Sequence, residues 1–182
     1  MKIICLLKFV PDVDSFEYDY EKNVLVRENV KQILNPDDAC ALGFALKLKK
    51  TNPDIEIEAV TMAPHSVKKF MEDVLRRHVD KGTLISDPLF AGSDTLATSL
   101  ILGTYLKRTP YDVILTGSQT LDGDTAQVPA QIAEFLNISY MSGIMKIDEQ
   151  SFLQGTPQVE VDTENHTDIY ELTFPSLLAV RR

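Results

Sequence analysis

Apolar runs and stripes of apolar residues at helical spacing alternate along this chain, and that alternation limits its fold more than any other feature. Four segments are expected to form strands: 2–10, an apolar run typical of a buried parallel strand; 55–62, which alternates and then becomes apolar; the short 81–86; and 111–116. Stripes with a period of about 3.6 residues predict four helices: 37–50, 66–77, 94–107 and 128–136. Repeated β-α-β units imply an α/β fold with a doubly wound, mostly parallel sheet in three layers.

The sequence also predicts structure outside these four strands and four helices. A short hairpin is expected around Glu21-Lys22-Asn23, and several strands are expected after residue 137. His78 lies on the apolar side of its predicted helix, which suggests a helix-end or core position. Because no linker, repeat or low-complexity stretch interrupts the chain, we expect one domain over residues 1–182.

Charge and hydropathy exclude several classes of partner. The net charge of −9 argues against nucleic acid, whose phosphates would repel the chain. No window approaches the roughly 20 apolar residues of a membrane span.

Lys8 interrupts the first apolar run, which favours a buried strand over an export signal, and Cys5 and Cys40 lack metal-ligand spacing. These features predict a cytoplasmic protein.

The loops after the strands are where a ligand is expected, because open parallel sheets bind ligands outside the carboxyl ends of their strands. Four segments occupy such places: Phe9–Asp14, Thr61–Ser66, Asp87–Thr95 and Gly117–Gln127. The last of them is the richest in turn-forming residues. We expect it to border the largest polar-lined cavity, together with 9–12 and 61–64.

Residues 117–129 can be interpreted in two ways. Gly117 permits a sharp turn off the strand, and Gly123 permits positive φ. Pro129 is comfortable only in the first turn of a helix, so the free N–H groups of that turn face the loop and offer a phosphate site. The alternative is an ordinary strand-to-helix turn with Asp124 as its N-cap. These residues alone leave both open.

The sequence gives little support for a catalytic site, a metal site or another class of nucleotide-binding motif. The loop lacks the spacing of the dinucleotide fingerprint, and no P-loop is present, which disfavours a dehydrogenase or a P-loop kinase. No two histidines have metal-ligand spacing, and no Ser/His/Asp arrangement can be traced. Asp122 and Asp124 lack a second acidic loop end with which to bind Mg²⁺ or act in acid–base catalysis.

Four segments of the chain together resemble the electron-transfer flavoprotein β-subunit family, over residues 1 to about 180. The segments are Lys8-Phe9-Val10-Pro11-Asp12, Ile33-Leu34-Asn35-Pro36-Asp37-Asp38, residues 90–98 and residues 117–127. Asp122-Gly123-Asp124-Thr125-Ala126-Gln127-Val128 is the most specific of the matches. It is similar to the anaerobic bacterial, electron-bifurcating branch. The implied fold is Rossmann-like, as in the adenine-nucleotide alpha hydrolases.

The resemblance implies a cofactor site. Its implied positions are Phe9, Asp12, Asn35, Met62, Asp94, Thr95, Thr98, Gly117, Asp122, Gly123, Asp124, Thr125, Ala126, Gln127 and Val128. By resemblance, Asp122 and Gln127 contact ribose or phosphate, and the N–H groups of 125–128 take the phosphates. Residues 94–98 lie beside the flavin ring, where threonine hydroxyls can hydrogen-bond its edge.

The resemblance also implies a function and partners. Members of the bifurcating branch carry FAD in the small subunit, where the simpler branch carries AMP. The chain is accordingly expected to bind FAD, or alternatively AMP, and to act as an electron carrier rather than an enzyme. The implied partners are a larger, α-like flavin-carrying subunit in a heterodimer, and a dehydrogenase or ferredoxin as electron partner.

Three departures from the family pattern keep other functions open. Pro129 replaces a usual glycine, and 76–79 replace a small helix end. The sequence stops at Arg182, where relatives continue into a long arm around the larger subunit, so we expect a domain without that arm. One alternative is a non-redox module that holds AMP or ATP in a structural or regulatory role. Another is a scaffold that binds nothing.

Overall fold

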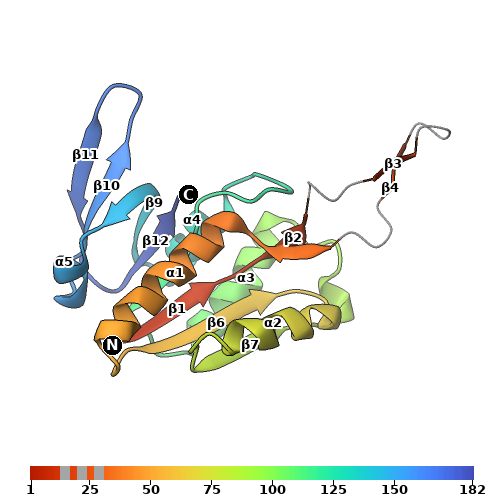
Figure 1. Ribbon diagram of the computed structural model, residues 1–182, viewed down its shortest axis with the longest axis horizontal. Helices are drawn as coiled ribbons and strands as arrows, with labels where there is room; N and C mark the ends of the chain where they lie inside the picture. Colours follow the sequence, from red (N-terminus) through yellow and green to blue (C-terminus); the bar gives the residue numbers. More distant parts are fainter. Residues whose placement is uncertain (13–16, 20–23, 27–30) are drawn as a thin grey trace.

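The centre of the protein is an eight-stranded sheet (Figure 1). The computed structural model describes residues 1–12, 17–19, 24–26 and 31–182. The strands run across the sheet in the order β11 (Thr167–Glu171), β10 (Gln158–Asp162), β9 (Ser139–Ile147), β12 (Ser176–Val180), β8 (Val113–Gly117), β1 (Lys2–Leu6), β6 (Glu56–Met62) and β7 (Lys81–Ile85). All pairings from β9 to β7 are parallel, and β10 and β11 are antiparallel at one edge.

The four strands predicted from apolar runs are β1, β6, β7 and β8, and their parallel pairing is confirmed. Ile3, Ile4 and Cys5 of β1 are fully buried, and every residue of β8 is buried. These two central strands are covered on both faces, so their consecutive residues are apolar rather than alternating. The sequences of the other two are less continuously apolar, because β6 carries two glutamates and the edge strand β7 is exposed at its first two residues.

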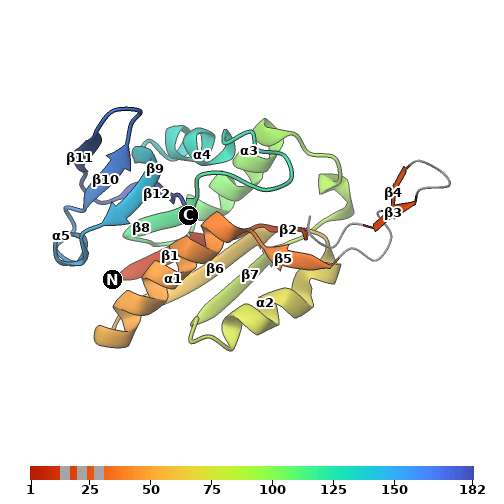
Figure 2. The same ribbon diagram turned by 45° about the horizontal axis from the view of Figure 1, so that its top comes forward.

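Helices cover both faces of the sheet, which confirms the doubly wound, three-layer prediction (Figure 2). The helices are α1 (Pro36–Thr51), α2 (Lys68–Leu75), α3 (Thr95–Leu106) and α4 (Val128–Leu136). One apolar cluster joins the sheet to α1 and α2, and a second joins it to α3 and α4. The predicted helix over 66–77 is shorter, because a 3₁₀ turn, η2 (His65–Val67), precedes α2.

The prediction of a single strand over 2–10 is wrong at its end. β1 stops at Leu6, and β2 (Phe9–Pro11) pairs antiparallel with β5 (Gln32–Leu34) in a separate ribbon. The cause lies at Lys8, whose backbone N–H donates to the Asp38 side chain instead of to a neighbouring strand. A side chain that takes a backbone donor in this way ends the strand ladder.

The expected hairpin and the late strands are also present. β3 (Glu17–Asp19) pairs antiparallel with β4 (Val24–Val26), and the predicted turn residues 21–23 lie outside the described residues. After α4 come β9, a short helix α5 (Glu149–Leu153) and the β10–β11 hairpin, which projects from the body of the molecule (Figure 1). The last strand, β12, lies between β8 and β9, and all five of its residues are buried.

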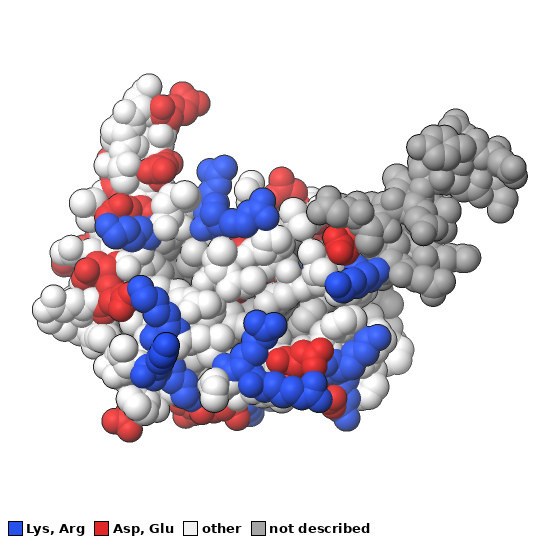
Figure 3. Space-filling view, in the orientation of Figure 1, with Lys and Arg blue, Asp and Glu red and all other residues white. Residues whose placement is uncertain are grey.

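Charge is spread unevenly over the surface. Figure 3 shows Lys and Arg gathered over α1 and α2, although the chain carries a net charge of −9. Residues 47–81 contain eight Lys and Arg but six Asp and Glu, so the acidic excess lies elsewhere in the chain. None of the helices in the described part of the chain has the length and apolar character needed to cross a membrane.

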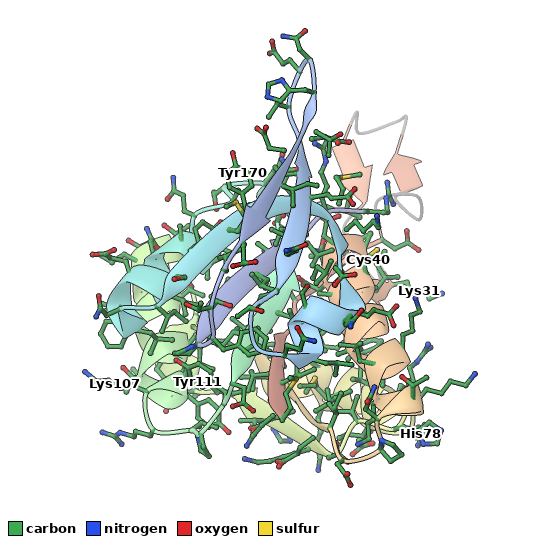
Figure 4. All side chains as sticks on the ribbon, turned by 90° about the vertical axis from the view of Figure 1, so that its left-hand side faces the viewer. Lys31, Cys40, His78, Lys107, Tyr111 and Tyr170 are labelled. Atoms are coloured by element: carbon green, nitrogen blue, oxygen red, sulfur yellow. The ribbon has the colours of Figure 1, made fainter. Side chains whose placement is uncertain are left out.

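His78 and Tyr170 lie outside the core, in different parts of the molecule (Figure 4). His78 follows α2 with a left-handed backbone (φ 67°) and is exposed, which confirms its expected place at a helix end. Tyr170 lies on the projecting β11 and is 41% exposed. Neither borders the cavity described next.

Candidate functional site

A cavity of about 700 Å³ opens at the carboxyl ends of β1, β6, β7 and β8. Loops from all four strands line it, together with η3 (Pro88–Phe90) and the first turns of α3 and α4. Ten predicted site residues lie in its wall: Met62, Asp94, Thr95, Thr98, Gly117, Gly123, Thr125, Ala126, Gln127 and Val128. These ten residues come from three separate parts of the sequence and meet because the strands are parallel.

The cavity is less polar than the sequence predicted. Its floor is formed by apolar side chains from three strands and one helix: Leu6, Val60, Met62, Ile85 and Leu102. Polar groups lie around the rim, on the loop after β8 and the start of α3. A cavity with an apolar floor and a polar rim suits a ligand with a flat aromatic part and a charged part.

Five predicted site residues do not line this cavity: Phe9, Asp12, Asn35, Asp122 and Asp124. The predicted contribution of 9–12 is wrong, because the chain leaves the sheet at Lys8 and residues 6–8 border the cavity instead. Phe9 packs against Phe70 with ring centroids 5.7 Å apart. The Asp12 backbone N–H donates to the carbonyl of Lys31 at 2.8 Å.

Asn35 lies behind the loop that follows β8 and holds its backbone. It is 1% exposed. Its Nδ2 donates to the Gln119 carbonyl at 2.7 Å, and its Oδ1 accepts from the Leu121 N–H at 3.3 Å. Next to it, Asp37 Oδ2 accepts from the Gln119 N–H at 3.2 Å. The start of α1 therefore shapes the loop from the side away from the cavity.

Asp38 holds the ends of two strands together beside the cavity. It is 3% exposed. Its Oδ2 accepts from the Lys8 N–H at 2.8 Å, and its Oδ1 accepts from the Gly117 N–H at 2.7 Å. Burial raises the pKa of Asp38 to about 7, although these backbone hydrogen bonds act to lower it.

The same contact explains why residue 117 is glycine. A Cβ on Gly117 would lie 2.6 Å from Asp38 Oδ1 and 2.8 Å from the Asp38 nitrogen. Its φ is not in the left-handed region. Close approach to α1, rather than a sharp turn, is what requires glycine at this position.

The loop conformation corrects two further expectations. Gly123 does not have positive φ, whereas Asp124 (φ 45°) and Ala126 (φ 53°) do. Asp tolerates the left-handed region better than most residues because its short side chain can hydrogen-bond locally. Asp124 is not the N-cap of α4, since that position belongs to Gln127, whose side chain makes no capping hydrogen bond.

The N-terminus of α4 is open to a ligand. Helix α4 begins at Val128, and Pro129 in its first turn has no N–H, as the sequence predicted. None of the residues that the structure describes accepts a hydrogen bond from the backbone N–H groups of 125–128. Unpaired N–H groups at a helix N-terminus, together with the helix dipole, favour an anion.

A cation that the sequence analysis did not single out lies at the rim. Lys8 borders the cavity, and its Nζ lies 2.7 Å from Asp122 Oδ1. Burial acts to raise the pKa of Asp122, but hydrogen bonds from Lys8 and Thr120 outweigh it and lower the pKa. Lys8 lies two residues after the end of β1, whereas the strand-end rule, applied to a strand over 2–10, selected the segment that begins at Phe9.

The α3 side of the cavity joins the loop through side chains. Thr95 Oγ1 donates to Gln127 Oε1 at 3.0 Å, and Asp94 caps α3 by accepting from the Ala97 N–H at 2.8 Å. Ser99 Oγ lies 2.8 Å from Gln131 Oε1, which ties α3 to α4. These links fix the two helix starts relative to each other.

The loop after β8 also borders a second hollow of about 360 Å³ on its other side. Asn35, Asp37 and Asp124 line that hollow, with Arg181 and Arg182. The backbone N–H of Arg182 donates to Asp37 Oδ1 at 3.1 Å. Two of the predicted residues that miss the main cavity, Asn35 and Asp124, therefore lie behind its wall.

Five titratable side chains line the cavity: Lys8, Asp38, His65, Asp87 and Asp94. No group of three metal-ligating side chains occurs among the residues that the structure describes. His65 borders the cavity, and His78 and His166 do not. What the cavity offers is an open helix N-terminus, a rim cation, threonine hydroxyls and an apolar floor.

Comparisons with known proteins agree on one family. A family profile described as "Electron transfer flavoprotein domain" matches residues 22–182. The "Electron transfer flavoprotein subunit beta" of Clostridium acetobutylicum is 36% identical over 191 residues, which cover 100% of this chain and 73% of the relative. "Caffeyl-CoA reductase-Etf complex subunit CarD" of Acetobacterium woodii is 37% identical, over 98% of this chain and 67% of the relative. "Protein FixA" of Azorhizobium caulinodans is 33% identical, over 99% and 66%.

Proposed function

This chain belongs to the electron transfer flavoprotein β-subunit family, and we propose that it binds FAD in the cavity at the carboxyl ends of β1, β6, β7 and β8. In this proposal residues 1–182 form one cofactor-binding domain, and the chain works as an electron carrier subunit in the cytoplasm. The observation that carries the proposal is the cavity itself, where an open helix N-terminus adjoins an apolar floor.

The size of the cavity supports FAD over AMP. Its volume of about 700 Å³ lies in the upper part of the range of roughly 300–1,000 Å³ for small-molecule sites. AMP is the smaller half of FAD and would fill the part next to α4. The rest of the cavity, with Val60, Ile85 and Leu102 in its floor, is apolar and suits a flavin ring.

The phosphates are assigned to the backbone of residues 125–128. Their N–H groups have no acceptor among the described residues, and the partial positive charge of α4 favours an anion by roughly 0.3–2 kcal/mol. Lys8 adds a side-chain cation at the same rim. Pro129 removes one donor from the first turn of α4 but not from 125–128.

The flavin side is assigned to the start of α3. Thr95 and Thr98 line the cavity there, and the Thr95 hydroxyl already contacts Gln127. Bound FAD would supply the electron-transfer chemistry, and the protein would supply position and electrostatics. Asp94 serves as the helix cap and keeps that helix start in place.

A partner subunit completes the proposal. We assign the partner as a larger, flavin-carrying α-type subunit, with a dehydrogenase or a ferredoxin as the further electron partner. Exposed leucines near the cavity support a covered surface: Leu89 is 89% exposed, Leu96 is 56% exposed and Leu100 is 43% exposed. Leu96 and Leu100 lie one turn apart on α3, and neighbouring exposed apolar side chains favour protein contact.

The spectrum of the purified protein tests the cofactor. We expect a yellow protein with a flavin absorption spectrum, and FAD released on denaturation and identified by chromatography. A colourless protein that releases AMP or ATP would support the non-redox module instead. A colourless protein that releases no nucleotide, and binds neither FAD nor AMP when titrated, would refute the proposal.

Two threonines of one helix provide a matched test of the site. Thr98→Val removes a hydroxyl from the cavity wall, whereas Thr104→Val removes one that is exposed and bonds only the Leu100 carbonyl at 2.6 Å. We expect Thr98→Val to weaken FAD binding and shift the flavin absorption bands, and Thr104→Val to do neither. Equal effects of both substitutions would contradict the assignment of α3 to the flavin.

A further inference from the structure

We propose that Asp38 couples the binding of an anionic cofactor in this cavity to the uptake of a proton. The inference rests on the proposed function, because it requires a phosphate-bearing ligand beside α4. Asp38 would be a positioning residue: it acts through the backbone of two strand ends. Its role differs from that of residues 125–128, which face the phosphates.

The geometry gives Asp38 two connections to the site. It borders the cavity, and its two oxygens accept from Lys8 and Gly117, the residues at which β1 and β8 reach the cavity. In both hydrogen bonds a backbone N–H is the donor and Asp38 is the acceptor, which suits an ionised carboxylate. Once protonated, the carboxyl group carries a hydrogen of its own and its oxygens become weaker acceptors, so the hydrogen bonds to the two strand ends weaken.

The surroundings leave the Asp38 charge poorly compensated. From its own helix, Asp37 adds a like charge, and the Asn35 amide supports the ionised form. β1 contributes the Cys5 thiol, whose pKa is raised by burial. The segment after β1 contributes the backbone N–H of Lys8, which donates to Asp38. The Lys8 ammonium is already paired with Asp122 of the loop, and β8 contributes no charged group.

From the end of β12, the Arg182 backbone N–H donates to Asp37 rather than to Asp38. Burial, helped by Asp37, raises the pKa of Asp38 to about 7 against the backbone hydrogen bonds. A small added charge is therefore enough to change its protonation near neutral pH.

A pyrophosphate is such a charge. Its two negative charges would disfavour the ionised form of Asp38 still further, so the complex would hold more of the proton than the free protein does. The sign follows from that difference: affinity is highest below about pH 7, where Asp38 is already protonated in the free protein. Above that pH the affinity falls, by at most about tenfold per pH unit for one proton.

Calorimetry of FAD binding to the apo-protein tests this coupling. FAD is the probe because its pyrophosphate does not titrate near neutral pH, whereas the phosphate monoester of AMP does, with a pKa of about 6. At about pH 7.5, the binding enthalpy is measured in two buffers of different ionisation enthalpy, which gives the protons taken up. The dissociation constant is then followed from about pH 6 to about pH 8.5.

We expect the wild type to take up a fraction of a proton and to bind FAD more weakly as the pH rises. Asp38→Asn should abolish the uptake and flatten the pH profile. Asp73→Asn, which neutralises a 63% exposed carboxylate of α2 that pairs with Arg76, should keep both. If Asp38→Asn does not fold, Asp38→Ser, which likewise cannot ionise, takes its place, and a wild type that takes up no proton overturns the inference without either variant.

Different outcomes would contradict the role of Asp38 and the proposed binding of FAD. FAD binding without proton uptake in the wild type would overturn this inference and leave the proposed function intact. Uptake that persists in Asp38→Asn would overturn it as well, because another group would then be responsible. If no binding heat appears at any pH, the proposed function fails and the inference fails with it.

Discussion

The backbone N–H of Gly117 donates a 2.7 Å hydrogen bond to Asp38 Oδ1, across 79 positions of sequence. This contact brings the end of β8 against the first turn of α1, so closely that no side chain fits on residue 117. The loop that leaves β8 starts from this fixed point and continues past Asn35 and Asp37 to α4. The shape of the cavity wall is therefore set by a helix that lies behind it.

Gly117→Ala tests this close approach. The added Cβ would meet backbone and carboxylate atoms of Asp38 that cannot easily move, so we expect a loss of about 1–3 kcal/mol in the free energy of unfolding. FAD affinity should fall as well, because the loop is displaced. Gly123→Ala is the matched control, since a Cβ there has nothing within 4 Å. Urea unfolding and FAD titration measure both effects, and equal stability of the two variants would contradict this account.

Ala126→Val tests whether the left-handed loop backbone presents the phosphate donors. A β-branched residue is strained at a φ of 53°, so we expect the loop to change shape and FAD affinity to drop at least several-fold. Ala126→Gly is the control, because glycine adopts this φ without strain and keeps the backbone N–H. The comparison is made by FAD titration. If Ala126→Val binds FAD as the wild type does, the N–H groups of this loop are not what holds the phosphates.

Glu58→Gln tests a buried ion cluster at the far end of the sheet. The Glu58 side chain is fully buried, and its carboxylate contacts four side chains: Lys2, Lys81, Thr83 and Tyr105. Burial acts to raise the pKa of Glu58, but these contacts outweigh it and lower the pKa from 4.5 to about 2. That lowering corresponds to about 3 kcal/mol of stability, present above about pH 4.5 and lost as the pH falls toward 2.

We therefore expect Glu58→Gln to lower the free energy of unfolding at pH 7 by about 3 kcal/mol and to cost little near pH 2. Glu56→Gln on the same strand is the control, because the Glu56 side chain is 51% exposed and its pairing with Lys2 is worth little. Denaturant unfolding across this pH range provides the measurement. A cost for Glu58→Gln that does not depend on pH would indicate lost packing instead of lost charge.

Asp38→Asn should show the opposite dependence on pH. The folded pKa of Asp38 is raised from 3.8 to about 7, so this group weakens the fold as the pH rises through that interval, by about 4 kcal/mol in total. The variant cannot ionise and escapes that loss, although it gives up one of two hydrogen bonds. Its stability relative to the wild type should improve between about pH 5 and pH 8. A constant difference over that range would show that Asp38 does not titrate there.

The sequence predicted the framework because strand burial and helix periodicity are local properties. The apolar run of β8 and the stripe of α4 each identify their own element without knowledge of the rest. The end of β1 was misplaced because it depends on Asp38, a residue 30 positions away from Lys8. No local pattern reports such a contact.

The same distinction holds for the candidate site. Ten of the fifteen predicted positions line the cavity, since strand order alone brings those loops together. The predicted role of Gly123 was wrong because glycine permits positive φ without requiring it, and the loop places that strain on Asp124 and Ala126. Asn35 was expected at the ligand, but its hydrogen bonds to Gln119 and Leu121 place it behind the wall.

The placement of β12 has a consequence for how the protein is made. β12 lies between β8 and β9 but follows both in the chain, so a nascent chain on the ribosome has neither of these strands paired on that side until residues 176–180 emerge. Unpaired strand edges of this kind invite chaperones or aggregation. We expect chains stalled before residue 176 to be cut by protease near β8, and chains stalled well beyond residue 182 to resist. Synthesis of β12 would then be the step that commits this sheet to its final form.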